Sequence, residues 1–115
     1  MNRTESKYAE LLEAKRLAGE ILYWEFERIK IRLGQSCYYT PDFLVIDAQG
    51  RIEFHEVKGF WRDDARVKSK VAAEAVPWAG WFAYQLKGGQ WVEEDLNPKD
   101  RKVIDYEEDT KGTTT

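Results

Sequence analysis

One predicted hairpin constrains the fold more than any other feature of this sequence. Residues 38–47 and residues 51–58 each carry apolar side chains in strand-like patterns, and Ala48-Gln49-Gly50 between them is typical of a tight turn. Two acidic residues lie among apolar neighbours in these strands: Asp42 is about seven residues before the turn, and Glu56 is about seven residues after it. An antiparallel hairpin therefore brings the two carboxylates together at the end away from the turn.

A third charged residue joins this pair. Lys58 is two residues after Glu56 and faces the same side of the strand, whereas Val57 faces the other side. Two converging carboxylates repel each other unless one is protonated or a cation neutralises them. Mg²⁺ prefers carboxylate oxygens, completed by water and substrate phosphate. We therefore predict a Mg²⁺ site, in which Mn²⁺ can substitute, with Asp42, Glu56 and the Val57 carbonyl as ligands. The alternative is a simple ion pair in which Lys58 bridges the two acids.

The rest of the chain predicts two helices and further strands. The expected elements are a helix over residues 4–18, a long strand over 22–33 with a bulge or turn in its middle, a helix over 63–75, a strand over 81–86 and a short edge strand over 90–93. A helix between two strands predicts a parallel crossover. The order α-β-β-β-α-β indicates a small mixed α/β domain, with helices on one or both faces of the sheet.

The negative net charge of the chain does not exclude a nucleic-acid partner. The net charge is −3, but eight of the 21 acidic residues and only four of the 18 basic ones lie from Glu93 onward. The remainder is nearly neutral, so a nucleic-acid partner is not excluded. We assign residues 1–94 to one domain and residues 95–115 to a charged, flexible tail. Cys37 is the only cysteine, which excludes an internal disulfide. The sequence has no long apolar run and no signal-peptide pattern, so we expect a cytoplasmic protein with no membrane partner.

At this point the residues resemble a known family. Pro41-Asp42 followed by Glu56-Val57-Lys58 resembles the motif of the PD-(D/E)XK nuclease superfamily, and the predicted element order resembles its common core. The stretches YTPDFLV, EVKGFW and DARVKSKVAAE are similar to small phage-encoded endonucleases related to Holliday-junction resolvases. The resemblance covers roughly residues 5–86. It implies a restriction-endonuclease-like fold, Mg²⁺-dependent hydrolysis of DNA, a preference for branched DNA, and catalytic roles for Asp42, Glu56 and Lys58.

The resemblance also implies a further acid from the first helix. Glu5, Glu10 and Glu13 are the candidates, and we favour Glu5 because the pattern ExKYAxLL around it resembles the helix signature of the family. A carboxylate near a helix start can instead act only on the helix dipole. His55 lies on the opposite face of its strand from Glu56, so we expect no role for it at the metal.

Basic residues on the second predicted helix suggest how DNA is held. Arg62, Arg66 and Lys70 follow one another at intervals of four, so they form one stripe opposite the apolar face of Val67 and Val71. A basic stripe that starts beside a metal site suits the phosphate backbone of DNA. The alternative is a solvated helix face without a partner.

Two functional hypotheses follow. The first is a metal-dependent DNA endonuclease that hydrolyses phosphodiester bonds. The second is a catalytically inactive nucleic-acid-binding or assembly protein that keeps the nuclease fold. One catalytic trio cuts one strand at a time, so paired cuts in branched DNA predict a homodimer, and a monomer that nicks one strand is the alternative.

Overall fold

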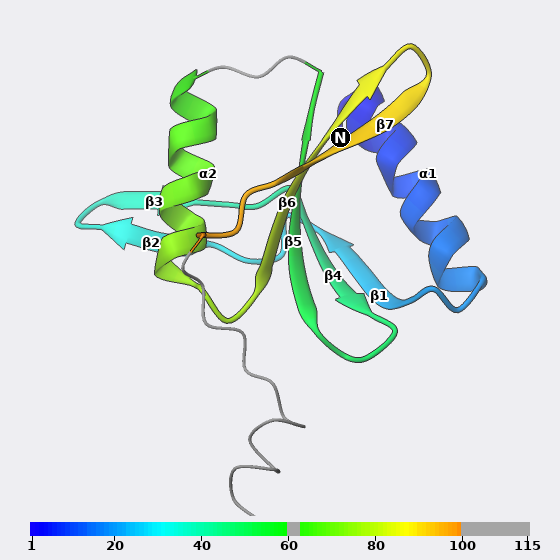
Figure 1. The fold of residues 1–115 in the computed structure, drawn as a ribbon, viewed down its shortest axis with the longest axis horizontal. Coiled ribbons are helices and arrows are strands. Elements are labelled where there is room, and N and C mark those ends of the chain that lie inside the picture. Colours follow the sequence, from blue (N-terminus) through cyan, green and yellow to red (C-terminus); the bar gives the residue numbers. More distant parts are fainter. Residues whose placement is uncertain (60–62, 100–115) are drawn as a thin grey trace, which may run out of the picture.

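The computed structural model describes residues 1–59 and 63–99 (Figure 1). Its elements, in chain order, are α1 (Arg3–Leu17), β1 (Ile21–Phe26), β2 (Ile31–Gly34), β3 (Cys37–Tyr39), β4 (Phe43–Asp47), β5 (Ile52–Lys58), α2 (Asp63–Ala75), β6 (Gly80–Lys87) and β7 (Gln90–Asp95). The fold is mixed α/β, as the element pattern predicts. Neither helix within these residues has the length and apolar character that crossing a bilayer requires.

The main sheet has the order β1-β4-β5-β6-β7. The β4–β5 hairpin is antiparallel, as expected from the turn, and β1 pairs antiparallel with β4. The chain then crosses through α2 to β6, which pairs parallel with β5, and β7 returns antiparallel as the second edge. The predicted parallel crossover is therefore confirmed. At the end of the hairpin away from its turn, Phe43 pairs with His55. This register determines which residues meet there.

Two predicted strands are broken by a second, smaller sheet. The expected strand over 22–33 ends at Phe26, and the chain turns at Glu27, whose φ of 49° is left-handed. The expected strand over 38–47 is interrupted between Tyr39 and Phe43. The intervening strands β2 and β3 pair only with each other. The chain leaves the main sheet where the alternation of apolar and charged residues breaks, beside Arg28. The predicted turn in the middle of residues 22–33 is therefore confirmed, and the prediction of one long strand is wrong.

Helix α1 covers one face of the main sheet. Its side chains Tyr8 and Leu12 are buried against Phe43 and Val45 of β4 and Val57 of β5. Side chains of a strand alternate in direction, so this face also receives His55. Burial of such large apolar groups is the main source of stability for a domain of this size.

Helix α2 covers the opposite face (Figure 1), together with the β2–β3 hairpin. Its Ala72 and Ala73 are buried against Phe54 of β5 and Trp81 of β6. The predicted apolar face was wrong: Val67 is 61% exposed and Val71 is 41% exposed. Small side chains line the buried face instead, because a bulky Trp81 already fills the space between the helix and the sheet.

The packed domain extends slightly beyond its predicted end at residue 94. Leu96 is buried in the α2-side core, and its backbone nitrogen donates to the Trp81 carbonyl at 3.0 Å. The Trp81 nitrogen in turn donates to Asn97 Oδ1 at 2.8 Å. Residues 95–97 therefore belong to the domain rather than to a flexible tail. Residues 100–115 of the expected tail lie outside the described residues.

Candidate functional site

The β4–β5 register brings the predicted acidic pair together. Phe43 pairs with His55, so Asp42, one residue before β4, lies opposite Glu56. The Asp42 backbone nitrogen donates to Glu56 Oε1 at 3.0 Å. The Val57 nitrogen donates to Asp42 Oδ2 at 2.8 Å. Asp42 is 8% exposed and Glu56 is 2% exposed. These reciprocal hydrogen bonds fix two nearly buried carboxylates at the end of the hairpin.

Lys58 lies between the two carboxylates. Its Nζ is 3.2 Å from Glu56 Oε2 and 3.9 Å from Asp42 Oδ2. Burial alone would lower the pKa of the Lys58 amine, but the charges of Glu56 and Asp42 outweigh it, so the net shift is upward. Lys58 therefore remains a cation. The ion pair that was the alternative to a metal site is therefore present. One ammonium group nevertheless faces two buried carboxylates, so its single positive charge cannot neutralise both.

The pKa of Asp42 records this imbalance. Burial and the neighbouring charge of Glu56 raise the pKa of Asp42 to about 7, although the Val57 hydrogen bond and Lys58 act in the opposite direction. An ordinary aspartate has a pKa near 3.8. Near neutral pH, a cation that binds beside Asp42 can therefore displace its proton to water.

Two further acids, the expected Glu5 and the unexpected Glu27, lie next to Asp42. Glu5 of α1 and Glu27 after β1 each place a carboxylate oxygen within 4.8 Å of one from Asp42 and of one another. Glu5 also accepts from the Asn2 nitrogen at 2.8 Å in a capping box at the start of α1. A carboxylate has two oxygens, so capping and metal binding are compatible.

Sequence reasoning missed Glu27. Phe26 pairs with Phe43, so Glu27 lies opposite Asp42, and its nitrogen donates to the Asp42 carbonyl at 2.9 Å. The signal was present as the break in alternation beside Arg28. A strand that ends at this break places Glu27 at the same sheet end as Asp42.

The remaining candidate ligands are Glu10, Glu13 and the Val57 carbonyl. Glu10 is exposed on α1. Glu13 accepts from the Arg16 Nε at 2.7 Å and from the Trp24 indole at 2.9 Å, so it serves as a structural acceptor. The backbone nitrogen of Val57 binds Asp42, while the role of its carbonyl stays a prediction. Among the three helix acids, Glu5 is the one that the structure groups with Asp42.

Tyr39 was also missed as a neighbour of the site. Burial and the charge of Glu56 raise the pKa of the Tyr39 phenol well above its ordinary value, so it stays protonated. Its hydroxyl lies 3.3 Å from Ser69 Oγ of α2. Ser69 in turn donates to the Ala65 carbonyl at 2.8 Å. This contact connects α2 to the residues beside Glu56.

A buried polar chain lies on the other face of β5. The Tyr8 hydroxyl is 2.6 Å from His55 Nδ1, and Glu53 Oε1 is 2.8 Å from His55 Nε2. A carboxylate only accepts, so Nε2 carries the hydrogen and Nδ1 accepts from Tyr8. His55 therefore joins α1 to the strand that carries Glu56 and Lys58.

Replacing Tyr8 by Phe is expected to destabilise the domain. The variant leaves His55 Nδ1 buried without its donor, which costs about 1–3 kcal/mol. The matched control is Tyr23→Phe, because the Tyr23 hydroxyl also donates to a side chain, that of Glu25, but the residue is 43% exposed. Urea unfolding of the three proteins checks this. Equal midpoints for Tyr8→Phe and the original chain would contradict a stabilising role for the bond.

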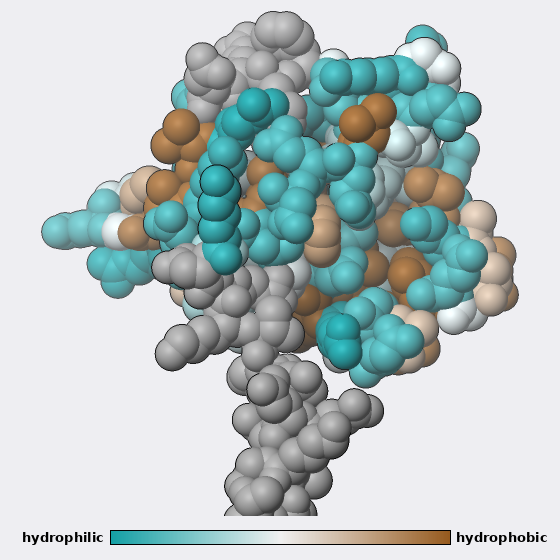
Figure 2. All heavy atoms as spheres, in the orientation of Figure 1, coloured by the Kyte–Doolittle hydropathy of each residue, from teal (hydrophilic) through white to brown (hydrophobic). Residues whose placement is uncertain are grey.

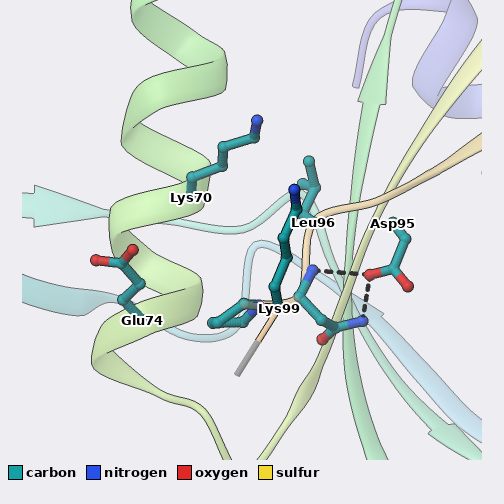
Figure 3. A pocket seen from close by; sticks show the side chains of 7 residues that line it. Lys70, Glu74, Asp95, Leu96 and Lys99 are labelled. Atoms are coloured by element: carbon teal, nitrogen blue, oxygen red, sulfur yellow. Dashed lines mark hydrogen bonds between the residues drawn. The ribbon is translucent and has the colours of Figure 1, made fainter. Parts of the chain in front are cut away.

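The predicted basic stripe on α2 is only partly described. Arg62 lies outside the described residues. Arg66 Nη2 is 3.1 Å from Glu94 Oε1 of β7, so part of its charge is balanced. Lys70 is exposed and lines a pocket with Glu74, Asp95 and Lys99 (Figure 3). Side chains of both signs line this pocket, so it lacks the excess of positive charge that a DNA-binding surface requires. The role of the stripe in DNA binding stays a prediction.

Comparisons of the chain with models of known families, with curated proteins and with solved structures give no match. The geometry of Asp42, Glu56 and Lys58 and their sequence pattern are therefore the basis for inferring a function.

Proposed function

We propose that the chain is a metal-dependent endonuclease that hydrolyses phosphodiester bonds in DNA. The observation that carries the proposal is the convergence of Asp42, Glu56 and Lys58 at one end of the β4–β5 hairpin, with both carboxylates nearly buried. Burying two carboxylates costs folding free energy unless their charges are neutralised. Such groups are therefore found mainly at sites where they have a function. Attracting a divalent cation to a fixed position is such a function.

The donor set suits Mg²⁺ or Mn²⁺. Carboxylate oxygens from Asp42, Glu5 and Glu27 lie close enough to share one cation, and Glu56 is adjacent to Asp42. Hard cations favour such all-oxygen sites and leave positions for water and phosphate. When bound there, the cation supplies polarisation of the scissile phosphate and an acidified water.

The chain itself supplies positioning and charge. Asp42 releases a proton near neutral pH to create the anionic site. Lys58 stays protonated and is partly exposed, so it can donate to a phosphate oxygen or orient the attacking water. Positive charge aimed at the developing negative charge of the phosphate stabilises the transition state.

The architecture agrees with this proposal at a coarser level. A helix, a mixed sheet with an antiparallel hairpin, and a helical crossover to a parallel strand are compatible with the order α-β-β-β-α-β of the nuclease resemblance, to which the β2–β3 hairpin and β7 are additions. The restriction-endonuclease-like core, the cytoplasmic location and the preference for branched DNA are parts of the same proposal.

The deciding experiment compares linear, forked and four-way DNA on one gel with Mg²⁺, Mn²⁺, Ca²⁺ or EDTA. We expect cleavage with Mg²⁺ and Mn²⁺, none with EDTA, and the highest rate on branched DNA. Ca²⁺ is larger and less strict in geometry, so it should support binding without efficient cleavage.

Binding to DNA with no cut under any metal condition would instead favour the catalytically inactive nucleic-acid-binding protein. The homodimer stays a prediction that depends on paired cuts.

A further inference from the structure

The β2–β3 hairpin and the residues that lead into it carry positive charge and no acidic side chain. Residues 28–40 contain Arg28, Lys30 and Arg32 and no acidic residue, although the chain as a whole is acidic. The hairpin extends away from the main sheet beside α2 (Figure 1), and its tip is hydrophilic (Figure 2). A local positive arm on an acidic protein points to a polyanionic partner.

The two faces of the hairpin differ. Ile31 is buried, and Leu33 and Tyr39 pack against the same α2-side core. Side chains alternate along a strand, so Arg32 and Tyr38, which pair across the hairpin, face away from that core. Arg32 is exposed, and Tyr38 is 44% exposed. An apolar face anchors the hairpin while the other face presents a cation and an aromatic ring to solvent.

Local contacts hold these groups in place without neutralising them. Lys30 Nζ lies 4.6 Å from the centre of the Tyr38 ring, a cation–π contact. Arg32 Nε donates to the Gly34 carbonyl at 3.2 Å. In the part of the chain that the structure describes, the ion pairs within 4.0 Å involve neither Lys30 nor Arg32. Arg28 differs, since it lies 3.8 Å from Glu25.

The hairpin also leads directly to the candidate site. Tyr39 lies beside Glu56, and Asp42 follows it by three residues. Three extended residues span about 10 Å. A DNA strand carries one phosphate per ~3.4 Å of helix axis, so a strand held at Asp42 reaches the hairpin within about three phosphates.

We infer that the outward face of the β2–β3 hairpin binds the DNA strand that enters the candidate site. Lys30 and Arg32 contact phosphates, and Tyr38 both orients Lys30 and stacks on an unpaired base. Aromatic stacking on bases is independent of sequence, and it favours single-stranded or branched DNA over a closed duplex. This inference rests on the proposed nuclease function, because it assigns part of the substrate to that site.

The experiment measures DNA binding separately from cleavage. All variants carry Asp42→Asn, and affinity for forked DNA and blunt duplex is followed by anisotropy in EDTA across a salt series. Lys30→Gln with Arg32→Gln should weaken binding about ten-fold or more and reduce the slope of log K against log salt by about two. Lys7→Gln with Lys87→Gln removes the same charge from exposed positions elsewhere and should leave the slope unchanged.

Tyr38→Leu keeps an apolar side chain but removes the ring. It should weaken binding to forked DNA about ten-fold and change binding to blunt duplex much less. Circular dichroism of each variant verifies that the hairpin changes leave the fold intact.

Equal losses of DNA binding from the hairpin pair and the control pair would overturn the inference. Hairpin variants that bind anionic phosphatidylserine vesicles less tightly but bind DNA normally would also overturn it.

The two proposals fail in different ways. If the hairpin variants lose DNA binding but the original chain cuts no DNA with any metal, the nuclease proposal fails, and the hairpin keeps only the role of a DNA-binding surface. If the original chain cuts DNA and the hairpin variants bind like the control pair, the hairpin inference fails alone.

Discussion

Replacing Asp42 by Asn or Glu56 by Gln is expected to abolish Mg²⁺-dependent DNA cleavage, with a rate loss of at least about 100-fold. Each change keeps the size of the side chain and an oxygen that can still accept a backbone hydrogen bond. Each removes a negative charge from the position where a cation would bind. The measurement is the single-turnover cleavage rate on four-way DNA, with circular dichroism as evidence that the fold is retained.

Glu10→Gln is the matched control for these variants. It neutralises an acid in the same way, but Glu10 is exposed on α1 and lies outside the acidic group around Asp42. We expect unchanged cleavage from Glu10→Gln and a higher Mg²⁺ requirement from Glu5→Gln. The site is assigned wrongly if Asp42→Asn or Glu56→Gln cuts at the original rate.

Without metal, the contribution of Asp42 to the free energy of unfolding should fall as pH rises from about 4 to about 7. The pKa of Asp42 is about 7 in the folded protein and near 3.8 in an ordinary environment, so in this window the folded protein holds a proton that the unfolded chain releases. The proton-bound contribution to stability is complete below pH 4 and is lost as pH rises through 7. One pKa unit is worth about 1.4 kcal/mol, so a shift from 3.8 to about 7 corresponds to a total loss on the order of 4 kcal/mol.

The difference in free energy of unfolding between the original chain and Asp42→Asn isolates Asp42 together with its charge interactions with Glu56 and Lys58, because groups far from Asp42 contribute equally in both proteins. In EDTA the Asn variant should be the more stable protein at pH 8, and the two should converge towards pH 4. Mg²⁺ should then stabilise the original chain at pH 8 and leave the variant unaffected, since a ligand of the folded state raises the free energy of unfolding. Urea unfolding at several pH values provides the measurement. A pH-independent difference would show that Asp42 is not a proton-holding group.

Much of the site geometry was accessible from the sequence. Strand alternation and the short turn were enough to place Asp42 opposite Glu56, because a hairpin register follows directly from the position of its turn. The same local rules also predicted that Lys58 shares the face of Glu56. These residues interact through neighbouring strands, so no long-range information was needed.

The missed features depend on contacts between distant elements. Val67 and Val71 look like the buried face of α2, but the bulk of Trp81 and the added β2–β3 hairpin select the small side chains of Ala72 and Ala73 instead. Glu27 reaches Asp42 only because the chain leaves the main sheet directly after β1. Arg66 pairs with Glu94 only because β7 folds back so that Glu94 reaches α2. Periodicity cannot supply any of these three-dimensional arrangements.

The buried bond between Tyr8 and His55 has a consequence for how tightly the site can bind a cation. Glu5 is one helical turn before Tyr8 on α1, and Glu56 directly follows His55 on β5. The bond therefore limits the relative motion of the two elements that carry these carboxylates. Conformational entropy that is already lost during folding is not lost again when a ligand binds. The affinity for a cation is then determined by charge and dehydration, with little contribution from ordering of the protein.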